Sequence, residues 1–361
     1  AAPSDQTRRI KVMLARMLEA SGNRVGARAR IEEVLVEDST MVEALKMRAA
    51  WLVAEDRPGD AILDLRAALD QAPRDPEILT LMAQAHERDG AIDLAGERLA
   101  LAVEVSGRAV DTSLRYAAFL QQQARTEAAL AVLTDARQAN PTSVPVLARL
   151  ADLHLAAQDW PRAEEIGNAF RQIGTAEAIE AEKALQTALL LSQNRVSEGI
   201  AFLESQIGQG ADDLRAIALI VQTHAQAGEV AQARAYLDAE LAKRPDEPQL
   251  KLLSAGLHTL AGENAEAEAI LRDFIAKDPT AEAPVRLLYG LLASSQRAEE
   301  ATVVLDAALA AQPTSGTLRW LKAGELERSG DFEGAIAIYE AMYAEDSSNV
   351  VVANNLASLI T

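Results

Sequence analysis

A period of 34 residues constrains this chain more than any other feature, because the same residue types return at the same places along it. The stretch Val42 to Asp75 shows one unit: a helical pattern, a polar break from Glu55 to Gly59, a second helical pattern and a stop at Pro73. Such units begin at residues 8, 42, 76, 110 and 144 and, after a slip of two residues, at 180, 214, 248, 282 and 316. The period therefore predicts about ten helix-turn-helix units in one continuous array.

Two columns of residues define the second helix of the unit. The twentieth position holds only alanine or glycine: Ala27, Ala61, Ala95, Ala129, Ala163, Gly199, Ala233, Ala267, Ala301 and Ala335. The twenty-fourth position is large and apolar except at Gly167: Ile31, Leu65, Leu99, Leu133, Leu203, Leu237, Leu271, Leu305 and Tyr339. A spacing of four places both columns on one helix face. Small residues are expected there because two closely crossing helices leave no room for added methylene groups.

Turn residues follow the same period. Five glycines share the fifteenth position, where a residue in the left-handed conformation lets the first helix end: Gly22, Gly90, Gly228, Gly262 and Gly330. Five prolines share the thirty-second position, where a ring that cannot continue a helix ends the second: Pro73, Pro141, Pro245, Pro279 and Pro313. Aromatic residues make up only 4% of the chain and charged residues 25%, which favours a chain that is helical nearly throughout.

These columns resemble the tetratricopeptide repeat, as the run from Ser329 to Ala335 illustrates. The resemblance covers essentially the whole chain, and it implies an all-α fold, a right-handed α-solenoid of about ten tandem repeats. It divides the chain into an N-terminal tail (1–7), repeats one to five (8–177), repeats six to ten (178–349) and the first helix of a truncated or capping repeat (350–361).

Catalytic and metal chemistry have little basis in this sequence. The chain has no cysteine, which excludes thiol catalysis, disulfides and cysteine-ligated zinc. Glycine loops of the nucleotide-binding kind and the Gly-x-Ser-x-Gly motif are absent. The four histidines all fall on the eleventh position, where the family most often places a packed tyrosine: His86, His154, His224 and His258. We interpret them as packing residues, and we expect no catalytic residue, no metal and no cofactor.

Charge narrows the choice of partner. The formal net charge of -19 disfavours nucleic acid and anionic membrane surfaces, since both carry the same sign. No apolar run is long enough to span a bilayer. The sequence therefore predicts a protein or peptide partner whose binding segment is apolar or basic.

The resemblance implies that partners bind on an inner surface formed mainly by the second, fifth, ninth, twelfth and thirteenth positions of each first helix, here called the groove positions, with the sixth position contributing. In units eight to ten these positions include Leu252, Gly256, Arg286, Gly290, Trp320 and Gly324. Three glycines at one register position need a reason, because glycine inside a helix costs about 1 kcal/mol relative to alanine. One interpretation is a bare groove floor for a partner segment, with the arginine and the tryptophan as anchors. The alternative is tight packing of one unit on the next.

A second, polar stripe lies in units three to five. It includes Gln84, Arg115, Arg149 and Asp152, with the two arginines one unit apart. The lysine and asparagine pattern with which some members of the family hold an acidic C-terminal tail is not found in any three consecutive units. We therefore do not expect recognition of such a tail by that route.

The combined interpretation is a non-catalytic scaffold for protein-protein interaction. An alternative is the substrate-docking arm of a larger enzyme, such as a glycosyltransferase, whose catalytic domain lies outside this sequence. A third is a self-assembling array, since the helix from Val350 to Thr361 has no second helix to cover Leu356, Leu359 and Ile360. Similar arrays occur in bacterial envelopes, so we expect a periplasmic or envelope location, with the cytoplasm as the alternative.

Overall fold

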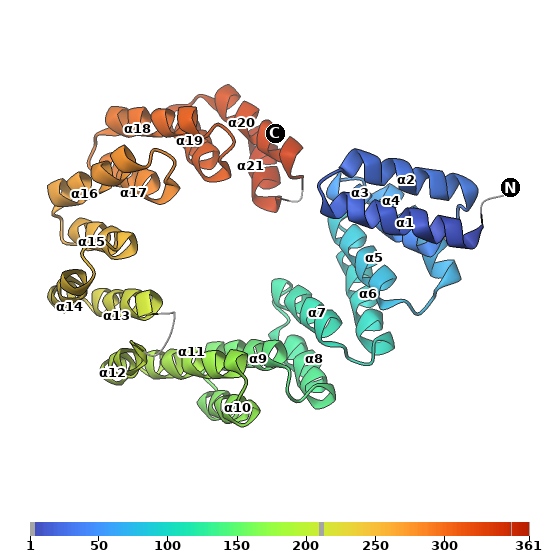
Figure 1. Ribbon diagram of the computed structural model, residues 1–361, viewed down its shortest axis with the longest axis horizontal. Coiled ribbons are helices and arrows are strands. Elements are labelled where there is room, and N and C mark those ends of the chain that lie inside the picture. Colours follow the sequence, from blue (N-terminus) through green and yellow to red (C-terminus); the bar gives the residue numbers. More distant parts are fainter. Residues whose placement is uncertain (1–3, 209–212, 348, 361) are drawn as a thin grey trace. The chain divides into compact units, whose positions relative to one another are not determined.

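The computed structural model describes residues 4–208, 213–347 and 349–360, and every regular element within them is an α-helix (Figure 1). The helices alternate between the first and the second helix of a repeat. Those that begin before residue 190 are α1 (Asp5–Ala20), α2 (Arg24–Glu37), α3 (Val42–Ala54), α4 (Pro58–Gln71), α5 (Pro76–Arg88), α6 (Ile92–Val105), α7 (Val110–Gln122), α8 (Thr126–Ala139), α9 (Val144–Ala156), α10 (Trp160–Ile173) and α11 (Ala176–Ser192).

Ten further helices follow in the same alternation. They are α12 (Val196–Gln206), α13 (Asp213–Gln226), α14 (Val230–Lys243), α15 (Pro248–Leu260), α16 (Asn264–Lys277), α17 (Glu282–Ser294), α18 (Ala298–Ala311), α19 (Gly316–Ser329), α20 (Phe332–Glu345) and α21 (Val350–Ile360). Most first helices begin at the residue where the 34-residue period places a unit. The main departure is α11, which begins at Ala176 rather than at residue 180, so its extra length coincides with the slip in the period.

The turn between the first and the second helix is the same in all ten repeats. The fifteenth residue always has a positive φ, which lies between +76° and +84° at the five glycines and between +56° and +61° at the other five. Those five are Asp56, Ala124, Gln158, Asn194 and Gln296. A residue with a side chain adopts this conformation at a cost, so the turn geometry is imposed by the repeat, and glycine marks only half of its occurrences.

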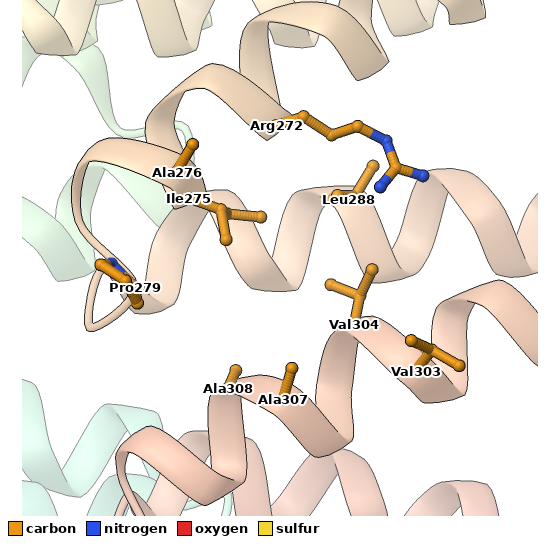
Figure 2. A pocket seen from close by; sticks show the side chains of 9 residues that line it. All are labelled: Arg272, Ile275, Ala276, Pro279, Leu288, Val303, Val304, Ala307 and Ala308. Carbon is orange, nitrogen blue, oxygen red and sulfur yellow. The ribbon is translucent and has the colours of Figure 1, made fainter.

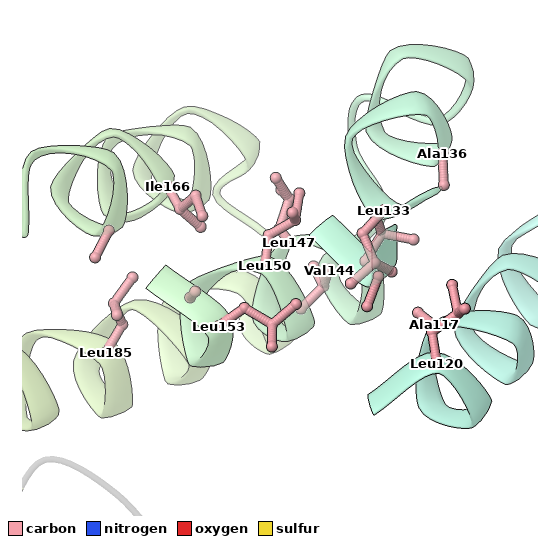
Figure 3. Packing of buried hydrophobic residues seen from close by; sticks show 14 of the residues in the cluster. Ala117, Leu120, Leu133, Ala136, Val144, Leu147, Leu150, Leu153, Ile166 and Leu185 are labelled. Carbon is pink, nitrogen blue, oxygen red and sulfur yellow. The ribbon is translucent and has the colours of Figure 1, made fainter. Parts of the chain in front are cut away.

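The chain divides into two compact parts, residues 1–189 and residues 190–361, with the division inside α11. They are called the first unit and the second unit, and a single helix pair is called a repeat. In both units the alanines of the twentieth position and the large residues of the twenty-fourth are buried. The first unit has two large clusters of buried side chains, and Figure 3 shows one of them, in which Leu120, Leu133 and Leu150 come from three successive helices. The second unit has four smaller clusters.

Repeats stack in the manner of an α-solenoid. Nearly every first helix packs closely on its own second helix, and most second helices pack on the first helix of the next repeat. Successive first helices also contact one another, as α13 does with α15 and α15 with α17, whereas no comparable contact joins successive second helices in the described residues. First helices therefore lie closer together, and within the second unit α13, α15, α17 and α19 line the inner side of the curve (Figure 1).

Candidate functional site

The glycine column lies on the inner surface of the second unit with open space above it. Gly256 and Gly290 are exposed and Gly324 is half-buried. A Cβ added at any of the three would have no heavy atom of a neighbouring residue within 4 Å. Gly199, in the small column of the second helices, differs because its Cβ would lie 2.9 Å from Cδ2 of Leu191. No neighbouring helix therefore packs closely on Gly256, Gly290 or Gly324.

The two expected anchors differ in how free they are. Arg286 on α17 is exposed, and in the described part of the chain it has neither an ion pair nor a side-chain hydrogen bond. Trp320 on α19 is half-buried, with its ring 5.5 Å from that of Tyr339 and inclined by 62°. Leu252 on α15 is also half-buried and packs against the cluster beneath it. Trp320 and Leu252 thus belong partly to the core, and only their outer edges are available to a partner.

A hydrogen-bonded arginine beside the glycines was missed by the sequence analysis. Arg328 on α19 donates from Nη2 to the hydroxyl oxygen of Tyr289 at 2.5 Å and from Nε to the carbonyl oxygen of Gly324 at 3.0 Å. Tyr289 belongs to α17, so this contact joins two repeats on the inner side. The signal in the sequence was tyrosine at the eighth position, where most units carry alanine.

The polar stripe of the first unit is internally neutralised. Arg115 pairs with Glu87 of the preceding repeat, and Arg149 lies 3.6 Å from the carboxylate of Asp152 on its own helix. Gln84 on α5 is half-buried. The structure therefore places each arginine of the stripe beside a carboxylate, which leaves little unbalanced charge for a partner.

Closer to the N-terminus, on α3, Lys46 lies among three carboxylates. Its Nζ lies 3.2 Å from Glu43 and 3.4 Å from Asp75, and it also pairs with Glu77 of the next repeat. The lysine side chain is only 6% exposed. Burial alone would lower the pKa of Lys46, but the three carboxylates outweigh burial and raise it. Glu43 also pairs with Arg16 of the first repeat, so ion pairs link the first three repeats.

Two of the four histidines are packing residues of the expected kind. His86 and His154 are buried, and desolvation lowers the pKa of both imidazoles. His154 lies 3.5 Å from the carboxylate of Asp159. Burial between the two helices of a repeat therefore accounts for these two side chains.

The other two histidines bind carboxylates, which the sequence analysis missed. Nδ1 of His224 lies 2.8 Å from Glu229, and Nδ1 of His258 lies 2.7 Å from Glu263. Arg234 on α14 also donates to Glu263 at 3.0 Å, and with His258 it lowers the pKa of this carboxyl to about 2. The signal was an acidic residue five positions after the histidine. Each carboxylate lies in the turn between the two helices of its repeat, so the contact holds the turn to the histidine of the preceding helix.

Comparison with known families decides what kind of repeat this is. Family models described as tetratricopeptide repeat match residues 120–169 in the first unit and residues 219–282 and 291–350 in the second. The chain is a tetratricopeptide-repeat protein. Repeats of this family form folds that act as protein-interaction scaffolds and are typically non-catalytic.

The solved structures that match this tetratricopeptide-repeat protein share little sequence with it. A tetratricopeptide repeat protein from Parabacteroides merdae is 16% identical with a TM-score of 0.46, and the match covers 70% of this chain and 98% of that one. PilF from Pseudomonas aeruginosa is 16% identical with a TM-score of 0.42, over the same shares. MamA is 16% identical with a TM-score of 0.37, over 47% of this chain and 95% of that one. Comparison with curated proteins gives no match.

A second concavity of this tetratricopeptide-repeat protein lies between second helices (Figure 2). Its volume is about 320 Å³, and it is lined by Ile275 of α16, Leu288 of α17 and Val304 of α18, among others. Arg272 stands at its edge and pairs with Glu268 at 2.7 Å. No residue pattern indicates this pocket, because it depends on how far α16 and α18 stand apart.

The last helix packs better than the sequence suggested. Leu356 and Leu359 of α21 contact the cluster around Tyr339, so the expectation that both would be uncovered is wrong. Val350, Val351 and Ile360 are the apolar side chains that α21 exposes, at 58% to 63%. The described residues contain no helix long and apolar enough to cross a membrane, and in those same residues no group of three or more histidine or acidic side chains could hold a metal ion.

Proposed function

We propose that this protein is a non-catalytic scaffold that holds a segment of another protein on the inner surface of α15, α17 and α19. The observation that supports this most directly is the open space above Gly256, Gly290 and Gly324. Helix-interior glycine is unfavourable, and here it gains no packing in return. The absence of side chains at these positions lets the backbone of a partner segment approach the helices closely.

The surroundings of the floor suit a segment with a large apolar side chain. Leu252 and Trp320 keep part of their surface exposed beside the glycines, and Arg286 is free to pair. Full burial of one large apolar side chain contributes about 1.5 to 3 kcal/mol. A few such contacts reach roughly micromolar affinity after the cost of ordering the segment.

The test is the substitution Gly290→Leu in the full chain. A partner captured from the source organism would be titrated against the parent and the variant, and the variant should bind about tenfold more weakly or worse. Leucine should not unfold the helix, because nothing lies within 4 Å of the added Cβ and leucine is a better helix former than glycine. Circular dichroism would verify unchanged helical content.

The matched control is Ala50→Leu. Ala50 occupies the same ninth position in the first unit and is exposed, so this variant adds the same side chain to the inner surface of the other half. It should leave affinity unchanged. Equal binding by Gly290→Leu and the parent would show that the partner segment lies elsewhere, and loss of binding with Ala50→Leu would place it in the first unit.

We also propose self-association through α21, which rests on the exposure of Val350, Val351 and Ile360. Light scattering over a range of protein concentrations should show an increase in mass that Val351→Asp abolishes. A constant monomer mass at every concentration would contradict this part of the proposal.

A further inference from the structure

We infer that the segment held by the second unit is acidic as well as apolar, an inference that rests on the function proposed above. The starting point is the charge of residues 190–361, where Asp and Glu outnumber Lys and Arg nearly two to one. In such a surplus of carboxylates, a cation without a carboxylate partner is the exception. The positions of such cations therefore indicate the charge of the partner that binds there.

Ten of the thirteen Lys and Arg residues in this stretch have a carboxylate within 4.0 Å. The three that lack one, within the described residues, are Arg215 on α13, Arg286 on α17 and Arg328 on α19. They occupy the second, fifth and thirteenth positions of their units, and all three of these are groove positions. Every cation away from the groove positions is paired.

Carboxylates avoid the same surface. Among the groove positions of the five first helices from α11 to α19, the only acidic residue is Glu327. Its Oε1 already accepts a hydrogen bond from the hydroxyl of Tyr339 at 2.6 Å. The remaining groove positions there carry small, apolar or neutral polar residues besides the three arginines. A unit that is acidic in total thus has an inner surface of the opposite sign.

The arginines are placed to receive carboxylates. Arg215 and Arg286 are exposed, and Arg328 donates only to the neutral oxygens of Tyr289 and Gly324. A guanidinium group binds a carboxylate with two parallel hydrogen bonds, which are stronger than those between neutral groups. Arg215 and Arg286 stand two repeats apart, roughly 20 Å at usual helix spacing. An extended segment of about six residues covers that distance.

This charge pattern changes the expected partner. The net charge of -19 pointed to a basic or apolar segment, but that charge lies away from the groove positions of the second unit. Surface charges more than about 8 Å away are largely screened at physiological ionic strength, so the groove meets its ligand mainly through its own arginines. Charge complementarity therefore favours a segment that alternates carboxylates with large apolar side chains.

The experiment selects displayed random peptides of about a dozen residues on the full chain. Peptides enriched on the parent should be rich in Asp, Glu and large apolar residues. A synthetic copy of the best peptide should bind about tenfold more tightly than its Asn and Gln counterpart, and the double variant Arg215→Gln, Arg286→Gln should lose a similar factor. The control Arg272→Gln removes a paired arginine of α16 and should leave affinity unchanged.

The outcomes separate this inference from the function on which it rests. Selected peptides that are neutral or basic, yet lose affinity with Gly290→Leu, would overturn the acidic partner and leave the groove intact. Peptides that bind Gly290→Leu and the parent equally would overturn the groove itself. The absence of any enriched peptide would overturn both.

Discussion

The two units present the same repeat positions to their inner side and use them in opposite ways. In the first unit every lysine or arginine at a groove position forms an ion pair with a carboxylate. These residues are Arg9, Arg16, Lys46 and Arg88. In the second unit the corresponding surface has three glycines, and three arginines that have no carboxylate partner in the described part of the chain.

The difference shows that the repeat scaffold does not determine the chemistry of its inner surface. Pairs such as Arg115 with Glu87 join neighbouring repeats and use up their charge within the protein. Bare glycines and free arginines contribute little to stability and remain available to another molecule. Under the proposed function, stability belongs mainly to the first unit and recognition to the second, so substitutions at equal positions should have different effects in the two.

The largest expected effect is that of Lys46→Met. Removal of the ammonium group leaves Glu43, Asp75 and Glu77 close together without a cation, and the loss of charged hydrogen bonds should lower the free energy of unfolding of the first unit by about 2 kcal/mol. Arg286→Met changes the fifth position of the ninth repeat and should alter stability by about 0.5 kcal/mol or less. Urea unfolding followed by circular dichroism, with amide exchange of α3 and α5, measures both.

Equal losses in the two variants would mean that Arg286 has a stabilising partner after all. The contrast between ion-paired cations in the first unit and unpaired arginines in the second would then be wrong. A loss confined to Lys46→Met would support it.

A smaller effect of opposite sign is expected at the groove floor. Gly290→Ala should raise the free energy of unfolding by about 0.5 to 1 kcal/mol, because alanine is the better helix former and its Cβ meets no atom. Gly199→Ala is the control, and it should gain less stability than Gly290→Ala, because its Cβ would lie 2.9 Å from Cδ2 of Leu191 and that side chain must move. Thermal unfolding compares the two. Destabilisation by Gly290→Ala would restore the packing interpretation of the column.

The smallest effect concerns acid stability in the second unit. Arg234 and His258 lower the pKa of Glu263 to about 2, below its unfolded value of about 4.3. The folded state therefore gains stability that is present above pH of about 4.3 and is lost as the pH falls toward 2. Glu263→Gln should flatten the dependence of the unfolding midpoint on pH within this window. Glu299→Gln removes an exposed carboxylate on α18 and should leave the profile as in the parent; identical profiles for both variants would contradict the role of Glu263.

Much of the fold could be predicted from residue patterns. The small column at Ala27 and its equivalents, the large column at Ile31, and the glycines at positions such as Gly262 all reflect local requirements that recur with the period. Turns without glycine, as at Ala124 and Gln158, were found by the period alone. The glycines of the groove were found as a pattern, but their meaning was not, because a sequence does not show whether a neighbouring helix fills the space above a residue.

What the sequence determined by itself is therefore the repeat: where most first helices begin, where the chain turns, and which face each helix buries. Local sterics and helix periodicity are sufficient for that, since they act within a few residues. Tertiary structure alone decided which charges meet, as Lys46 meets Glu77 from the next repeat, and which do not meet within the described residues, as with Arg286. The physical reason is that an ion pair between repeats requires two side chains to arrive within about 4 Å, and this depends on the rotation and spacing of packed helices rather than on either helix alone.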